Sequence, residues 1–70
     1  MEMISVKSSN LSDVGYDKEN RILYIRFHSG GLYAYYDVPE YEYHHLMSAS
    51  SHGKYFSAYI KRAYIYKKIS

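Results

Sequence analysis

The chain contains 70 residues, of which 47% are hydrophobic and 19% aromatic, and its formal net charge is +2. This length accommodates one domain over residues 1–70, and the hydrophobic content excludes a disordered chain. The absence of cysteine excludes disulfides and thiolate-bound metals. No apolar run approaches the ~20 residues of a membrane helix, and the N-terminus has no apolar segment typical of a signal peptide. We therefore expect a soluble cytoplasmic protein.

The first half of the chain alternates between segments typical of strands and of turns. Residues 1–10 indicate a short edge strand or arm, residues 14–16 a brief strand, and residues 17–20 a polar turn. The clearest strand covers residues 21–28. Its side chains point alternately to two faces: Leu23, Ile25 and Phe27 to one, and Tyr24, Arg26 and His28 to the other.

A hairpin turn at residues 29–31 leads into a return strand at residues 32–36. A two-residue loop would place Tyr33 and Tyr35 on the Tyr24 face of the preceding strand. A three-residue loop, with Gly30 in the left-handed conformation, would place them on the Leu23 face. The second loop needs only one glycine at the bulge, so the local sequence favours it.

Two short helices are predicted in the second half of the chain. Pro39 fits the first turn of a helix over residues 39–49, whose predicted core face is Tyr43, Leu46 and Met47. A polar break at residues 50–53 caps a second helix over residues 52–63. The buried stripe of that helix, at i, i+3, i+4, i+7 spacing, is predicted to be Phe56, Tyr59, Ile60 and Ala63.

Residues 64–69 indicate a last short strand or a frayed tail. Together these elements predict an α+β fold, with a small antiparallel sheet of three to four strands and two short helices on one face. A core of this size without disulfides is marginal, so we also expect a homodimer.

Three segments, in this order and spacing, resemble a known domain family. They are Ser8-Ser9-Asn10-Leu11 with Val14-Gly15-Tyr16-Asp17, then Leu23-x-Ile25-x-Phe27-x-Ser29-Gly30-x-x-Tyr33-x-Tyr35-x-x-Val38-Pro39, then Ala49-x-Ser51-x-Gly53-x-Tyr55-Phe56-x-x-x-Ile60-x-x-x-Tyr64. The pattern covers residues 8–64 and is similar to the KTSC domain, named after its place at the C-terminus of some lysyl-tRNA synthetases. The resemblance implies a small α+β domain without established catalytic activity, found alone or appended to other proteins, with stand-alone copies in bacteria and phages. The synthetase context implies RNA as a ligand, by association alone.

The predicted start of the second helix combines four residues suited to an anion: Ser51, His52, Gly53 and Lys54. Unpaired amides and the helix dipole favour negative charge there, the glycine permits close approach, and the two basic side chains add donors. This pattern predicts a phosphate or carboxylate site. The alternative is an ordinary serine cap with a glycine for tight packing.

The C-terminal segment interleaves cations with tyrosines: Lys61, Arg62, Tyr64, Tyr66 and Lys67. Cations neutralise phosphates while tyrosine rings stack on bases, so this segment predicts a nucleic-acid or partner surface. The alternative is a solvated helix face followed by a soluble tail.

The outer sheet face, with Tyr24, Arg26 and His28, is another candidate surface. It suits an aromatic platform for single-stranded RNA or the seam of a dimer. The alternative is a solvated face with ordinary cross-strand pairs.

No catalytic, cofactor or metal site is predicted. Glu40 and His44 share a helix face, but His45 points elsewhere and no fourth ligand is present. The serines lack a recognisable His–Asp constellation. The glycine pair at residues 30–31 joins two strands and does not open a helix, as a nucleotide-binding loop does.

The sequence therefore predicts a non-catalytic binding module for a phosphate-bearing ligand, either single-stranded nucleic acid or a nucleotide. The alternative is a small phage-type protein that binds and inhibits a host or defence protein through its tyrosine-rich surface. That alternative would act in the host cytoplasm.

Overall fold

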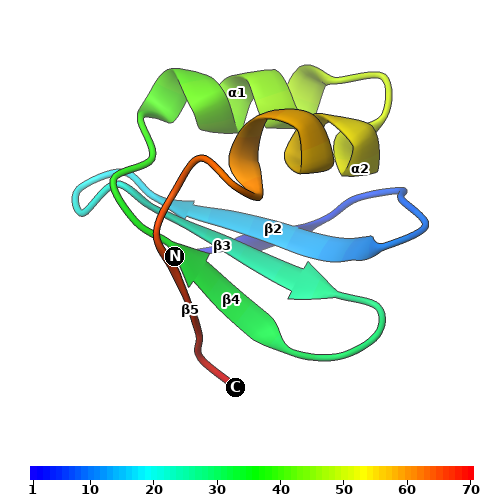
Figure 1. Ribbon diagram of the computed structural model, residues 1–70, viewed down its shortest axis with the longest axis horizontal. Coiled ribbons are helices and arrows are strands. Elements are labelled where there is room, and N and C mark those ends of the chain that lie inside the picture. Colours follow the sequence, from blue (N-terminus) through cyan, green and yellow to red (C-terminus); the bar gives the residue numbers. More distant parts are fainter.

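One antiparallel sheet of five strands forms one layer of the protein in the computed structural model, which describes residues 1–70 (Figure 1). The strands are β1 (Met3–Ser5), β2 (Leu11–Asp17), β3 (Ile22–Phe27), β4 (Leu32–Tyr35) and β5 (Tyr66–Lys68). Each strand lies beside its neighbours in sequence, and β5 pairs antiparallel with β4 although the helices lie between them in the chain. The predicted α+β class is confirmed, with one strand more than expected because both terminal segments pair with an edge of the sheet.

Helices form the second layer and cover one face of the sheet (Figure 1), as predicted. They are α1 (Glu40–Ser48), α2 (His52–Tyr55) and a π-helical turn, η1 (Phe56–Ile60), that continues α2. Pro39 precedes α1 in an extended conformation, and the Ser51 side chain caps α2 by accepting a hydrogen bond from the Lys54 amide. None of these helices has the length and apolar character needed to cross a bilayer.

The β3–β4 hairpin has the predicted three-residue loop. Ile25 pairs with Tyr33 and Leu23 with Tyr35, and the loop closes through a 3.2 Å hydrogen bond from the Phe27 amide to the Gly31 carbonyl. Gly30 adopts a φ of 108°, which L side chains rarely tolerate. This register places Tyr33 and Tyr35 on the face of the sheet that the helices cover.

The core lies between the helical layer and the central strands. Nine buried residues form it: Leu11, Val14, Leu23, Ile25, Tyr35, Val38, Leu46, Phe56 and Ile60. The predicted face of α1 is confirmed, because Leu46 is fully buried and Tyr43 and Met47 pack against the cluster. The same helix also buries Glu42, a carboxylate in its first turn.

The prediction for the second helix was wrong in its later half. Phe56 and Ile60 are buried as expected, but Tyr59 is 60% exposed and Ala63 is exposed beyond the end of η1. The Lys61 amide donates to the Phe56 carbonyl, five residues earlier, at 2.9 Å. A π-helical turn is wider than an α-helical turn, so the spacing used to predict the stripe fails after Phe56.

Candidate ligand-binding groove

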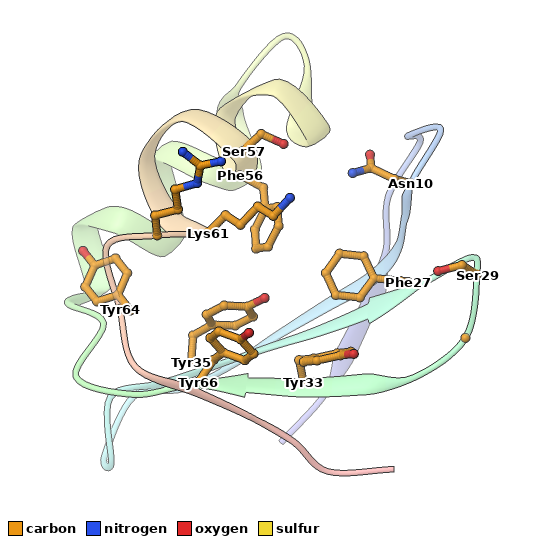
Figure 2. A pocket seen from close by; sticks show the side chains of 12 residues that line it. Asn10, Phe27, Ser29, Tyr33, Tyr35, Phe56, Ser57, Lys61, Tyr64 and Tyr66 are labelled. Carbon is orange, nitrogen blue, oxygen red and sulfur yellow. The ribbon is translucent and has the colours of Figure 1, made fainter.

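An open groove of about 570 Å³ lies between the β4–β5 edge of the sheet and η1 (Figure 2). We call it the aromatic groove; its lining is Asn10, Phe27, Ser29, Gly30, Tyr33, Tyr35, Phe56, Ser57, Lys61, Arg62, Tyr64 and Tyr66. Its volume is typical of small-molecule sites, which span about 300–1,000 Å³.

Aromatic rings make up the floor and the inner wall of the groove. Tyr66 lies with its ring centre 5.5 Å from that of Tyr35 and 6.0 Å from that of Tyr33. Phe56 meets Tyr35 edge to face at 5.5 Å, and Phe27 meets Phe56 at the same distance. Rings in mutual contact at these distances hold one another in place, so the groove is largely formed without a ligand.

The rim of the groove is positively charged. Lys61 and Arg62 are exposed, and the ion pairs of the protein involve other residues: Lys18–Glu40, Arg26–Asp13 and His44–Glu40. No Asp or Glu lines the groove. The two cations therefore stand beside the aromatic floor without a compensating carboxylate.

The groove brings together four of the five residues predicted in the C-terminal segment: Lys61, Arg62, Tyr64 and Tyr66. Lys67 is not among them. It pairs with Ala34, whereas Tyr66 pairs with Tyr35, and successive side chains of a strand point to opposite faces. Lys67 thus lies on the far face of the sheet.

A buried carboxylate anchors the end of the groove. Glu42 is only 8% exposed and accepts a hydrogen bond from the Tyr64 hydroxyl at 2.7 Å and another from the Tyr55 hydroxyl. Burial, together with these bonds, raises the pKa of Tyr55 to about 12 and also raises that of Tyr64. Glu42 thereby ties the chain that follows η1 to both helices.

Two of the three residues predicted on the outer sheet face, Tyr24 and Arg26, lie on one face of β3, but the third does not continue the row. Tyr24 is half-buried, and Arg26 forms a 3.6 Å ion pair with Asp13 on the neighbouring strand. His28 lies beyond the end of β3, where its Nε2 donates to the Ser8 carbonyl at 3.0 Å. Its ring therefore joins the hairpin loop to the segment before β2.

A second hollow, of about 490 Å³, lies beside the aromatic groove and contains the predicted anion-binding residues. We call it the polar hollow; its lining is Lys7, Ser8, Ser9, Asn10, Ser50, Ser51, His52, Gly53, Lys54 and Ser57. The two regions share Asn10 and Ser57. All ten residues are polar or glycine.

The fold itself uses most of the predicted anion-binding residues. The Ser51 hydroxyl caps α2, and His52 Nδ1 donates to the Leu46 carbonyl at 2.9 Å, near the end of α1. A side chain at Gly53 would collide with the Asn10 amide oxygen. Gly53 therefore permits the 8–10 segment to pack on α2, and Lys54 alone extends freely into solvent.

No group of three or more His, Asp or Glu side chains gathers in a geometry that could hold a metal ion. Glu40 and His44 form the expected contact one helical turn apart, at 3.2 Å. His45 instead packs edge to face on Tyr41 and Tyr55.

Sequence reasoning missed the sheet side of the groove, which is formed by Phe27, Tyr33 and Tyr35. A signal was present, since the three-residue loop already placed two tyrosines on the inward face of β4. An inward tyrosine near the edge of a sheet can keep its ring in the core and its hydroxyl near solvent. That combination indicates a groove more directly than the charges do.

Comparison with known proteins agrees with this architecture. The model of the KTSC domain matches residues 7–64. A KTSC domain protein of Yersinia pestis, solved by crystallography, superposes with a TM-score of 0.96 and 39% identity, covering 99% of this chain and 97% of its own. An uncharacterized protein of Stutzerimonas stutzeri is 39% identical over 87% of this chain and 86% of its own length. A protein of Tsukamurella paurometabola is 37% identical, with coverage of 84% and 88%. The chain belongs to the KTSC domain family.

Proposed function

We propose that this protein is a non-catalytic binding module for a phosphate-bearing ligand, either single-stranded nucleic acid or a nucleotide, and that the ligand occupies the aromatic groove. One observation carries the proposal: two cations without carboxylate partners border a floor of tyrosine rings. Proteins that bind single strands combine the same two components, a positive path for the backbone and rings for the bases. Such a ligand would be met in the cytoplasm, or in the host cytoplasm if the gene belongs to a phage.

The chemistry of the lining supports binding without catalysis. No His, Asp or Glu lines the groove, so a general base with a pKa near neutrality is missing from it. Burial, reinforced by the neighbouring Tyr66 and Tyr33, raises the pKa of Tyr35 to about 12. That hydroxyl stays protonated at physiological pH and is suited to hydrogen bonding.

The test is a titration of labelled single-stranded RNA and DNA at two salt concentrations. Replacing Lys61 and Arg62 together by Glu should weaken binding across sequences and reduce the salt slope by about one to two units, because up to two phosphate contacts are lost. Both side chains are exposed, so stability should change by less than about 0.5 kcal/mol each.

A matched control replaces Lys18 and Lys67 by Glu. It changes the net charge equally, but Lys67 lies on the far face and Lys18 in the turn between β2 and β3. We expect its salt slope to match that of the parent. If the two double variants weakened binding equally, binding would depend on the net charge of the protein and not on the groove. If the parent did not bind at low salt, the proposed function would be refuted.

A second candidate function, inhibition of a host or defence protein, is favoured by a different surface. Tyr41, His45, Tyr55 and Tyr59 form a continuous row of ring contacts across α1, α2 and η1. Tyr41 and Tyr59 are 62% and 60% exposed, and exposed tyrosines are enriched at protein interfaces.

Capture experiments from bacterial lysate distinguish the two functions. A protein partner should be retained after nuclease treatment and lost when Tyr41 and Tyr59 are both replaced by Ser. It should remain bound to the Lys61/Arg62 variant. Capture that disappears with nuclease would instead support nucleic acid as the ligand.

We also propose that the protein forms a homodimer. The hydrophobic core contains only nine residues, and Ile4, Ile65 and Ile69 are exposed near the two edges of the sheet. Burying such side chains between copies would add stability to a small core. Light scattering should show twice the 8.3 kDa monomer mass at micromolar concentration, and a constant monomer mass would refute this expectation.

A further inference from the structure

The Tyr35 hydroxyl is an unusual group on the groove floor. The residue is only 4% exposed, yet its hydroxyl forms no hydrogen bond within the protein. The tyrosine hydroxyls that donate a hydrogen bond within the protein are those of Tyr16, Tyr55 and Tyr64. No fully enclosed side-chain oxygen or nitrogen lacks a partner, so this hydroxyl must open to the groove. Figure 2 shows its oxygen directed along the floor, beside the Tyr66 ring.

Neighbouring rings fix the position of this hydroxyl. Phe56 contacts the Tyr35 ring at an interplanar angle of 82°, and Tyr66 lies against it at 31°. Since the ring belongs to the core cluster, it cannot turn its oxygen out to bulk solvent without disturbing that cluster. The groove therefore presents one fixed donor and acceptor at the base of aromatic walls.

This arrangement requires a ligand with two properties at once. Aromatic walls favour a flat ring, and a fixed neutral hydroxyl favours a polar edge on that ring. A free phosphate has no face to stack, and an aliphatic side chain has no polar edge. Nucleobases have both, because each has a π-face and hydrogen-bonding groups around its edge.

We infer that the aromatic groove accepts one unstacked nucleobase, whose polar edge bonds the Tyr35 hydroxyl while its phosphate lies toward Lys61 and Arg62. This inference rests on the proposed function and names the part of the ligand that the groove reads. Tyr35 is then a residue that determines base recognition, whereas the two cations contribute affinity irrespective of base.

The experiment compares two single-stranded oligonucleotides of equal length and charge, one with a single base among abasic sites and one fully abasic. The parent should prefer the base-bearing strand. Tyr35→Phe removes only the hydroxyl, so it should lose about three- to tenfold in affinity for that strand, as expected for one hydrogen bond. Its affinity for the abasic strand and its salt slope should match those of the parent.

Tyr24→Phe is the matched control, because Tyr24 pairs with Ala34 on the far face of the sheet. It should bind both strands as the parent does. Both variants keep the aromatic ring and neither removes a hydrogen bond within the protein, so both should fold.

The outcomes separate this inference from the proposed function. If the parent binds the two strands equally, no base enters the groove and the inference is wrong, while phosphate binding stands. If Tyr35→Phe binds the base-bearing strand as tightly as the parent does, Tyr35 does not read the base and the inference is again wrong. If the parent binds neither strand at low salt, the proposed function itself fails.

Discussion

The aromatic groove and the polar hollow are neighbours, yet their side chains are used in opposite ways. In the polar hollow, Ser51 and His52 bond the backbone at helix ends, and Gly53 receives the Asn10 side chain. In the aromatic groove, the Tyr35 hydroxyl and the charges of Lys61 and Arg62 have no partner of this kind.

This difference shows why polarity alone is a poor guide to a binding site. A polar side chain that already bonds the fold must give up that bond before it can bind a ligand, which costs free energy. A polar side chain without a partner inside the protein gives up only its hydrogen bonds to water when a ligand binds. We therefore expect substitutions in the polar hollow to act on stability and substitutions in the aromatic groove to act on binding.

The largest effect on stability is expected at Glu42 of α1, which bonds Tyr64 at the end of the aromatic groove. Glu42→Ala leaves the Tyr55 and Tyr64 hydroxyls without their acceptor, and should lower the free energy of unfolding by about 3 kcal/mol. Urea denaturation measures this change. Glu40→Ala is the control, because its carboxylate is exposed and forms only surface contacts; it should cost less than about 0.5 kcal/mol.

The packing role assigned to Gly53 gives the next prediction. Gly53→Val must displace Asn10, which would break the 3.0 Å bond from the Ser8 hydroxyl to Asn10. We expect a loss of about 1–2 kcal/mol in thermal or urea unfolding. Lys54→Val is the control at an exposed neighbour: it loses less than about 0.5 kcal/mol of helix propensity, whereas replacing glycine by valine carries no such loss. A loss for Gly53→Val no larger than that for Lys54→Val would therefore show that the contact is unimportant.

Two tyrosines sharpen the comparison between internal and free hydroxyls. Tyr55→Phe removes a hydrogen bond to Glu42 and should cost about 1 kcal/mol at neutral pH. Tyr35→Phe removes a hydroxyl without an internal partner, so its cost should be below about 0.5 kcal/mol. A larger loss for Tyr35→Phe would mean that its hydroxyl serves the fold.

A further effect is confined to alkaline pH. Burial raises the pKa of both Tyr35 and Tyr55 from 10.0 to about 12. A raised folded-state pKa stabilises the fold fully below the unfolded pKa, and this contribution is lost as pH rises through the folded pKa. The urea midpoint of the parent should therefore decrease as the pH rises from 10 to 12, and the midpoint of Tyr55→Phe should decrease less steeply over the same range. If the two midpoints decreased in parallel, the raised pKa of Tyr55 would not contribute to stability.

Local sequence determined much of the framework. The alternation of residues 21–28, the glycines of the hairpin, Pro39 before α1 and Ser51 before α2 each act through their immediate neighbours. Such short-range preferences depend little on the rest of the fold. They predicted the hairpin register and the helix starts.

The π-helical turn depends on longer-range contacts. Phe56 and Ile60 must both reach the core, and Tyr64 must reach Glu42 on α1. The spacing of apolar residues within 52–63 does not reveal these long-range contacts, so the exposure of Tyr59 could not be predicted from it.

The sequence by itself determined that Lys61, Arg62, Tyr64 and Tyr66 lie together in a basic, tyrosine-rich segment. Only the tertiary structure decided that β5 pairs with β4, which places Tyr66 beside Tyr35 and turns Lys67 to the far face. The reason is physical: a strand has two faces, and the partner strand determines which of them meets the core. The groove exists because that pairing brings Tyr66, near the C-terminus, against Tyr33 and Tyr35 of β4.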